Sequence, residues 1–226
     1  MTERTIAWLA SLCPHHDLAW DVATGNGQAA EALAAYFKSV FATDASARQI
    51  AETQPKTGIR YAVEPADLCS LADRSADLVT VAQALHWFAN EQFYAEVRRV
   101  LKPGGIFAAW GYALHTVNAA IDDIVSKYYS YIVGKFWPPE RMYVEQHYRT
   151  LPFPFAEITA PELWIENTYS LEQLLGYLAS WSSTQRFIKE RGTNPLELIA
   201  ADLKQAWGDA EQRPIRWPLF FRVAKI

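Results

Sequence analysis

The chain has 226 residues, about half of them hydrophobic and a fifth charged, which is enough for one α/β domain with a sizeable core. Its formal net charge of -4 argues against a general nucleic-acid binder, because such proteins normally present a basic face. Two cysteines are too few for a disulfide framework or a structural zinc site, and no apolar run reaches the roughly 18 residues of a membrane span. These properties favour a cytoplasmic protein that binds neither nucleic acid nor membrane.

Strands and helices alternate through the first half of the chain. The first 16 residues favour a short amphipathic helix over a signal peptide. Strands are predicted at residues 18–22, 39–43, 59–63, 77–82 and 106–110, and helices at 28–37, 46–52 and 90–101. This rhythm indicates right-handed crossovers and a parallel sheet with helices on both faces.

The second half of the chain loses this alternation. A helix at 118–133 and an aromatic, proline-rich stretch at 136–155 form a long excursion. A strand at 157–167, helices at 171–190 and 195–207, and a last strand at 216–224 follow. We therefore predict a single domain over residues 1–226, with an acceptor-side insertion at about 112–156.

A glycine turn, in the stretch AWDVATGNGQAA, joins the first strand to the first of these helices. Residues 25–30 match G-x-G-x-x-A, in which glycines allow a tight turn and close approach of the backbone to a nucleotide-like ligand. Alone, the pattern also fits a nicotinamide dinucleotide. It therefore indicates a nucleotide-like ligand without identifying it.

Acidic residues accompany the ends of the first three strands. Asp21 lies four residues before Gly25, Asp44 closes the second strand, and Asp67 follows the third. An acid at the second strand tip can accept hydrogen bonds from ribose hydroxyls, whereas several carboxylates together disfavour a pyrophosphate. The pattern favours a cationic adenosine compound without phosphates, and S-adenosylmethionine fits.

Four stretches of the chain, in order and at familiar spacing, are DVATGNGQAA, FATDAS, DLVTVAQALHWF and FYAEVRRVLKPGGIFAAWGY. In them the sequence resembles the class I S-adenosylmethionine-dependent methyltransferases, and most of all a branch grouped with the trans-aconitate methyltransferases. The later FWPPER, YRTLPFPF and LLGYLASWSSTQR extend this resemblance over nearly the whole chain. It implies an α/β, Rossmann-like fold with a seven-stranded sheet of order 3-2-1-4-5-7-6, the last strand antiparallel, helices on both faces and an inserted cap.

The resemblance also implies which residues bind the cofactor. Asp44 would take the ribose hydroxyls, Asp67 the adenine, and Gln83 would lie near the methyl-transfer centre. The full predicted set is Asp21, Ala23, Gly25, Gly27, Asp44, Ala45, Ala66, Asp67, Gln83 and Ala84. Two features depart from the family pattern: Ala23 replaces a glycine, and only about 20 residues precede Asp21, from which we expect looser cofactor binding or a more open acceptor pocket.

Methyl transfer from a sulfonium is an in-line displacement, so a base is needed only where the acceptor must lose a proton. An ionised carboxylate needs none, and it is our preferred small-molecule acceptor. His86, in QALHW, is the predicted catalytic residue, as a general base or hydrogen-bond donor, with a structural role as the alternative. The predicted acceptor-binding residues are Trp87, Tyr112, Arg141 and Tyr143. No metal is expected.

Two other functions compete with this interpretation. Tyr131 and Lys135 form Y-x-x-x-K, which short-chain dehydrogenases also carry, but residues 24–28 lack the glycine pattern of that family. A catalytically inactive S-adenosylmethionine-binding module or partner subunit is the second alternative. The set of glycines and acids favours an active enzyme.

Overall fold

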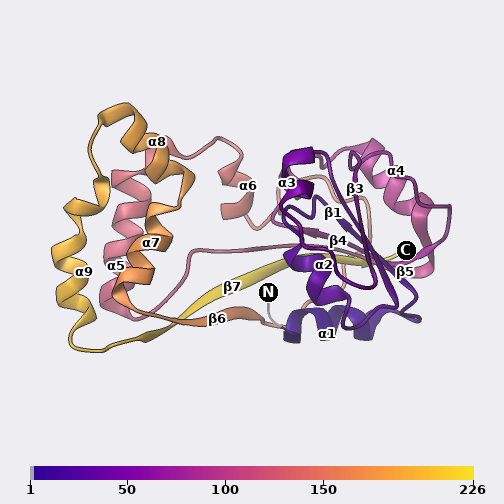
Figure 1. The fold of residues 1–226 in the computed structure, drawn as a ribbon, viewed down its shortest axis with the longest axis horizontal. Helices are drawn as coiled ribbons and strands as arrows, with labels where there is room; N and C mark the ends of the chain where they lie inside the picture. Colours follow the sequence, from indigo (N-terminus) through magenta and orange to yellow (C-terminus); the bar gives the residue numbers. More distant parts are fainter. Residues whose placement is uncertain (1–2) are drawn as a thin grey trace. The chain divides into compact units, whose positions relative to one another are not determined.

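The computed structural model describes residues 3–226 (Figure 1). They form two compact units: the first comprises residues up to Ala113 with Tyr143–Leu163 and Leu219–Ile226, and the second comprises Leu114–Met142 and Trp164–Pro218. The predicted single domain and its insertion stay a prediction. Within residues 3–226, no helix has the length and apolarity needed to traverse a bilayer.

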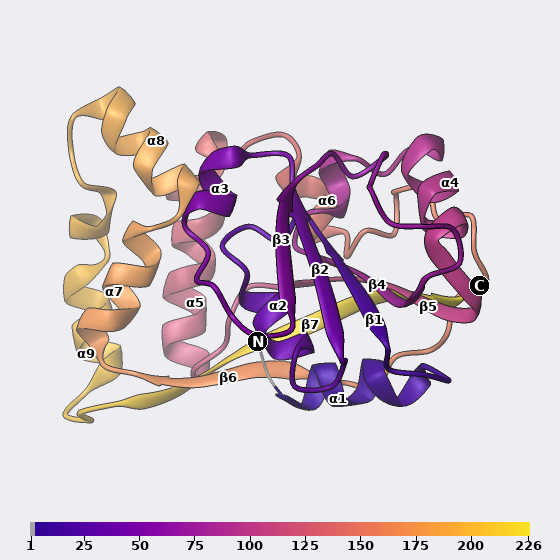
Figure 2. The same ribbon diagram turned by 45° about the vertical axis from the view of Figure 1, so that its right-hand side comes forward.

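The sheet has the strand order β3-β2-β1-β4-β5-β7-β6, which confirms the predicted fold. Its strands are β1 (Leu18–Val22), β2 (Ser39–Asp44), β3 (Ile59–Val63), β4 (Ala76–Ala82), β5 (Leu101–Tyr112), β6 (Trp164–Tyr169) and β7 (Arg213–Lys225). Strands β1 to β5 are parallel, and Figure 2 shows β1, β2 and β3 side by side. Strand β7 is antiparallel to both of its neighbours: its later residues pair with β5 and its earlier ones with β6.

Two apolar layers cover the sheet of the first unit, because successive side chains of a strand point to opposite faces. On one face, Ala19 and Val40 pack with α1 (Glu3–Leu12) and α2 (Gln28–Leu33). On the other face, Trp20 and Phe41 pack with α4 (Glu91–Val100). The short α3 (Ala47–Ala51), capped by the Ser46 hydroxyl, joins β2 to β3. Figure 1 shows these helices around the strands of the unit.

The second unit is mostly helical and contains much of the aromatic excess. Its helices are α5 (Ala119–Lys127), a π-turn at Tyr128–Ile132, α7 (Leu171–Ala179), α8 (Ser182–Arg191) and α9 (Ala200–Trp207), with 3-10 turns at Gly134–Phe136 and Pro195–Leu198. The short α6 (Arg141–Glu145) runs from the second unit into the first. The core residue Trp181 contacts the rings of Tyr128, Tyr129, Trp137 and Tyr177.

Several predicted boundaries differ from those observed. The helix predicted at 171–190 is two helices, because Trp181 has an extended backbone and is the N-cap that precedes α8. The strand predicted at 157–167 is shorter: β6 starts at Trp164, and Glu157 makes only an isolated bridge to Ala224. The helix predicted at 28–37 ends as a helix at Leu33 and continues as a turn.

Candidate active site

The glycine turn after β1 is folded tightly against the end of β2. Ala23, Gly25 and Gly27 all have left-handed backbones, with φ of 54°, 59° and 92°. A Cβ atom on Gly27 would lie 2.6 Å from the Tyr61 hydroxyl oxygen, so this position has no room for a side chain. At Ala23, an alanine occupies a conformation that glycine adopts with less strain. The Gly25 N–H donates to Asp44 Oδ2 at 3.0 Å, which ties the turn to the β2 tip.

Asp21 lies beneath this turn and is completely buried. Its carboxyl oxygens accept hydrogen bonds from the hydroxyls of Thr24 at 2.6 Å and Thr80 at 2.7 Å. Burial raises the pKa of Asp21 to about 6, because the interior disfavours the charged form. The structure buries this side chain, which we expected to face the ligand, against Thr24 of the turn. Its contact with the cofactor stays a prediction.

A cavity of about 780 Å³ opens at the carboxyl ends of the parallel strands, where ligands of such sheets bind. Among the predicted residues, Ala23, Gly25, Asp44, Ala45, Ala66, Asp67, Gln83, Ala84 and Trp87 line it. The sequence reasoning missed Ser46, Gln49, Glu64, Pro65, Ala82 and Phe88. All of these but Gln49 lie within two residues of a predicted one, and Gln49 lines the cavity because it stands three residues after Ser46, one turn into α3.

The charged residues of the cavity are all acidic. Asp44, Glu64 and Asp67 contribute carboxylates, and none of the lining residues that the structure describes is basic. Asp44 Oδ1 accepts from the Ser46 N–H at 2.8 Å, and Glu64 accepts from the Ser70 N–H at 2.8 Å. This end of the cavity suits a cationic or hydroxyl-bearing ligand better than one with phosphates.

The opposite end of the cavity, at the tip of β4, is neutral. Gln83 has a left-handed backbone (φ 57°), and its N–H donates to the Trp110 carbonyl at 2.8 Å. A Cβ atom on Gly111 would lie 2.6 Å from Gln83 Oε1 and 2.3 Å from Phe220 Cζ, so β5 passes the tip with no space to spare. The wall beyond is Trp87, whose side chain is 62% exposed.

His86 is half-buried in the 3-10 turn Leu85–Trp87 that follows β4. Its ring centroid lies 4.8 Å from that of Trp87, although His86 itself is not among the residues that line the cavity. Its Nδ1 lies 3.2 Å from the Tyr148 hydroxyl oxygen, a contact that the sequence reasoning missed. The structure therefore places the predicted catalytic residue beside the neutral end of the cavity.

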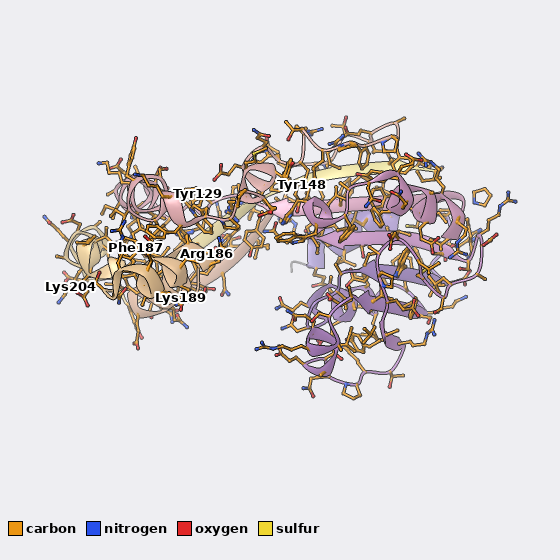
Figure 3. All side chains as sticks on the ribbon, turned by 90° about the horizontal axis from the view of Figure 1, so that it is seen from above. Tyr129, Tyr148, Arg186, Phe187, Lys189 and Lys204 are labelled. Atoms are coloured by element: carbon orange, nitrogen blue, oxygen red, sulfur yellow. The ribbon has the colours of Figure 1, made fainter. Side chains whose placement is uncertain are left out.

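The predicted acceptor-binding residues do not all gather at this cavity. Of these, only Trp87 lines it. Tyr112 ends β5 opposite Leu219, and Tyr143 packs against the core of the first unit. Arg141 belongs to the second unit, where its Nε donates to the Tyr129 hydroxyl at 2.8 Å. Its guanidinium carbon lies 4.8 Å from the Trp137 ring centroid. Tyr129 of the second unit and Tyr148 of the first unit are both labelled in Figure 3.

Across residues 3–226, no group of three or more His, Cys, Asp or Glu side chains is arranged to hold a metal ion. The features that remain are the glycine turn, the acidic cavity and the neutral tip of β4.

Comparisons with known proteins agree with this geometry. A family model described as a methyltransferase domain matches residues 20–109. A Dictyostelium discoideum protein named as a methyltransferase is 32% identical over 216 residues, covering 92% of this chain and 82% of that protein. A solved structure from Anaeromyxobacter dehalogenans, described as a type II methyltransferase, superimposes with a TM-score of 0.95 at 39% identity, covering 99% of this chain and 96% of that one.

A further relative is a Saccharomyces cerevisiae protein named as an S-adenosylmethionine-dependent methyltransferase. It is 29% identical over 119 residues, which cover 49% of this chain and 40% of that protein. The sheet order and the glycine turn define a Rossmann-like α/β fold with a ligand cavity at its strand tips. The chain belongs to the class I S-adenosylmethionine-dependent methyltransferases, and the protein is an enzyme of that family.

Proposed function

We propose that the protein transfers a methyl group from S-adenosylmethionine to a small acceptor, with a carboxylate oxygen as the attacking atom. The observation that supports S-adenosylmethionine as the cofactor is the acidic cavity beside the glycine turn. Asp44, Glu64 and Asp67 line it, and none of the described lining residues is basic. This charge fits an ammonium and a sulfonium group and disfavours a pyrophosphate. When bound, S-adenosylmethionine supplies an electrophilic methyl group on sulfur.

The residues at the two ends of the cavity have different roles. Asp44 accepts hydrogen bonds from the ribose hydroxyls while its two oxygens hold the Gly25 and Ser46 backbones. Asp67 accepts a hydrogen bond from the adenine amino group. At the neutral end, Gln83 and Ala84 position the reacting methyl group, and Trp87 excludes water. Holding the reactants in line and away from water can lower the barrier by roughly 7–11 kcal/mol.

The carboxylate acceptor is supported by the chemistry of the neutral end. The wall there consists of Gln83, Ala84, Trp87 and Phe88, and none of these can take a proton at neutral pH. An acceptor that is already ionised needs no base. The resemblance to the trans-aconitate branch points the same way, so small mono- to tricarboxylic acids are the first acceptors to test. The expected partner is a small-molecule acceptor in the cytoplasm. We expect the protein to bind neither nucleic acid nor a membrane.

Calorimetry followed by a turnover assay tests this proposal. We expect the full chain to bind S-adenosylmethionine and its demethylated product, and not NAD(H). Release of demethylated cofactor is then measured over a panel of carboxylates, phenols, thiols and amines. Tight NAD(H) binding without S-adenosylmethionine binding would overturn the cofactor assignment. Cofactor binding without turnover on any of the panel would instead favour the inactive module.

A further inference from the structure

One buried tyrosine, from a segment distant in sequence, contacts His86. The hydroxyl of Tyr148 lies 3.2 Å from His86 Nδ1, and the two ring centroids are 5.8 Å apart. Tyr148 is completely buried and lies in the chain that connects β5 to β6 (Figure 3). Both residues belong to the first unit. The contact is therefore a product of the tertiary fold of that unit.

The backbone that carries Tyr148 has an uncommon conformation. His147 and Tyr148 have φ of 51° and 59°, a left-handed region that residues other than glycine seldom occupy. The Tyr148 N–H donates to the Tyr143 carbonyl at 2.8 Å, and the Tyr148 carbonyl accepts from Arg222 at 2.6 Å. Such a conformation persists where surrounding contacts enforce it, and it is typical of functional sites.

Arg222, which holds this turn, is itself well anchored. It is buried on β7, it pairs with Glu157 at 2.9 Å, and its guanidinium carbon lies 4.4 Å from the Phe153 ring centroid. Hydrogen bonds made by an ionised group such as this guanidinium are shorter and stronger than those between neutral groups. Arg222 therefore holds the backbone of Tyr148, while Phe220 packs against its ring.

The pair adjoins the neutral end of the cavity. Phe220 of β7 contacts the Tyr148 ring with centroids 5.1 Å apart, and the same phenyl ring limits the space at Gly111 beside Gln83. The His86 ring packs against Trp87, which lines the cavity. Tyr148 and His86 are therefore connected to the residues at the tip of β4.

The chemistry of the two groups favours one placement of their shared proton. A neutral imidazole has one nitrogen that donates and one that accepts, and the hydrogen bond made by one nitrogen determines the role of the other. A phenol O–H is a stronger donor than the N–H of a neutral imidazole. The favoured arrangement is therefore donation from the Tyr148 hydroxyl to His86 Nδ1, which leaves the proton of the imidazole on Nε2.

We propose that Tyr148 is a positioning residue that holds His86 in the Nε2–H form. His86 does not itself line the cavity but packs against Trp87, which does, and from there it would meet an acceptor as a hydrogen-bond donor and not as a base. This inference rests on the proposed function and narrows its acceptor to an atom that is already anionic. A carboxylate oxygen forms the new O–CH₃ bond as the S–CH₃ bond breaks, and the electron pair of that bond goes to sulfur. No proton is released, so no base is required.

Nitrogen NMR of the full chain labelled with ¹⁵N-histidine tests the proton placement without any assay of activity. The chain has five histidines, and the His86 signal is assigned from the spectrum of His86→Gln. At pH values where the imidazole is uncharged, we expect His86 to carry its proton on Nε2 in the wild type. In Tyr148→Phe we expect a mixture of both tautomers.

Tyr128→Phe is the matched control, because Tyr128 is also buried and its hydroxyl also makes one side-chain hydrogen bond, to Thr184 at 2.8 Å. This control should leave the His86 spectrum unchanged. A proton on Nδ1 in the wild type, or the same tautomer in Tyr148→Phe as in the wild type, would overturn the proposal. The wild-type spectrum decides the tautomer even if Tyr148→Phe does not fold.

Kinetics with an active carboxylate then separates this inference from the proposed function. Tyr148→Phe should lower kcat on the order of 10- to 100-fold while the KM for the cofactor changes little, because the donor is misplaced and not the cofactor site. A Tyr148→Phe enzyme with unchanged kcat contradicts the positioning role. Absence of turnover with every carboxylate, beside an Nε2–H signal for His86, refutes the proposed acceptor and leaves the pairing of Tyr148 with His86 intact.

Discussion

Asp44 combines two tasks at the scale of a single residue. One of its oxygens holds the Gly25 backbone, the other holds the Ser46 backbone, and the side chain also lines the cavity. A carboxylate that already accepts two N–H groups is fixed before the ligand arrives. Under the proposed function, Asp44 therefore needs no reorientation of its side chain to accept hydrogen bonds from the ribose hydroxyls.

Asp44→Ala should weaken S-adenosylmethionine binding by about 1.5–3 kcal/mol, because a charged hydrogen-bond acceptor is lost. Titration calorimetry measures this as a rise in Kd on the order of 10- to 150-fold. Glu52→Ala is the control, since Glu52 is an exposed acid just after α3 and does not line the cavity. Equal affinity of Asp44→Ala and the wild type would show that the ribose lies elsewhere.

Asp21 makes the stability of the protein depend on pH in an unusual direction. Its pKa is raised by burial from 3.8 to about 6 in the folded state. Between these values the folded protein keeps a proton that the unfolded chain releases, so the contribution of Asp21 to stability is present at low pH and is lost as pH rises to about 6.

Asp21→Asn should therefore remove this pH-dependent loss of stability. The loss amounts to about 3 kcal/mol in the free energy of unfolding above pH 6. Urea unfolding of the wild type and the variant without cofactor, at pH 4 and pH 7.5, measures the difference. We expect the variant to gain stability relative to the wild type as pH increases. An identical pH dependence of the two proteins would mean that Asp21 titrates as an exposed carboxyl group.

At the scale of elements, the tip of β4 and strand β5 fit together only because Gly111 has no side chain. Gly111→Ala would drive a methyl group against Phe220 and Gln83, so we expect a loss of stability of about 1–3 kcal/mol and lower activity. Gly176→Ala is the contrasting variant, because Gly176 is exposed within α7 and has nothing within 4 Å of a new Cβ atom. It should stabilise by about 0.5–1 kcal/mol. Thermal unfolding of the two variants should move in opposite directions, and a parallel shift would contradict this packing.

The strand tips were predictable from sequence because the relevant signals are local. A glycine turn, an acid at a strand end and a proline-containing turn can each be recognised from a few consecutive residues. Gly25, Asp44 and Ala66, which belong to these three features, do line one cavity. The contact between Tyr148 and His86 was not predictable, since it depends on how a long connection folds against β7. The break between α7 and α8 was missed for a similar reason: Trp181 packs among the aromatic rings of the second unit, and that packing overrides a continuous helical pattern.

At the scale of the whole molecule, each of the two units has a buried ionisable group, and the two groups respond to acid in opposite ways. In the first unit, the folded protein holds a proton on Asp21 between about pH 3.8 and 6 that the unfolded chain releases. In the second unit, His115 is only 2% exposed and lies among Tyr177, Trp181 and Trp217. Neither of its ring nitrogens has a hydrogen-bond partner within residues 3–226. Burial lowers the pKa of His115 to about 4, because the interior disfavours the charged ring.

The second unit should therefore lose stability as pH falls from about 6.5 to 4, where the unfolded chain takes up a proton that the folded unit excludes. The loss amounts to about 3 kcal/mol over that range. Native-state hydrogen exchange, corrected for intrinsic rates, should show the amides of α7 opening more readily at pH 5 than at pH 7. His115→Phe should abolish this difference. Its persistence in His115→Phe would assign the acid response to another group.

Strand β7 has a consequence for how the protein is made. It follows every other helix and strand of the described chain, and both units depend on it: β6 pairs with its first half and β5 with its second. On the ribosome, the nascent chain therefore presents the outer edge of β5 and its apolar flank for as long as residues 113–212 take to be synthesised. Neither unit has its full set of strand pairings before Arg213–Lys225 emerges.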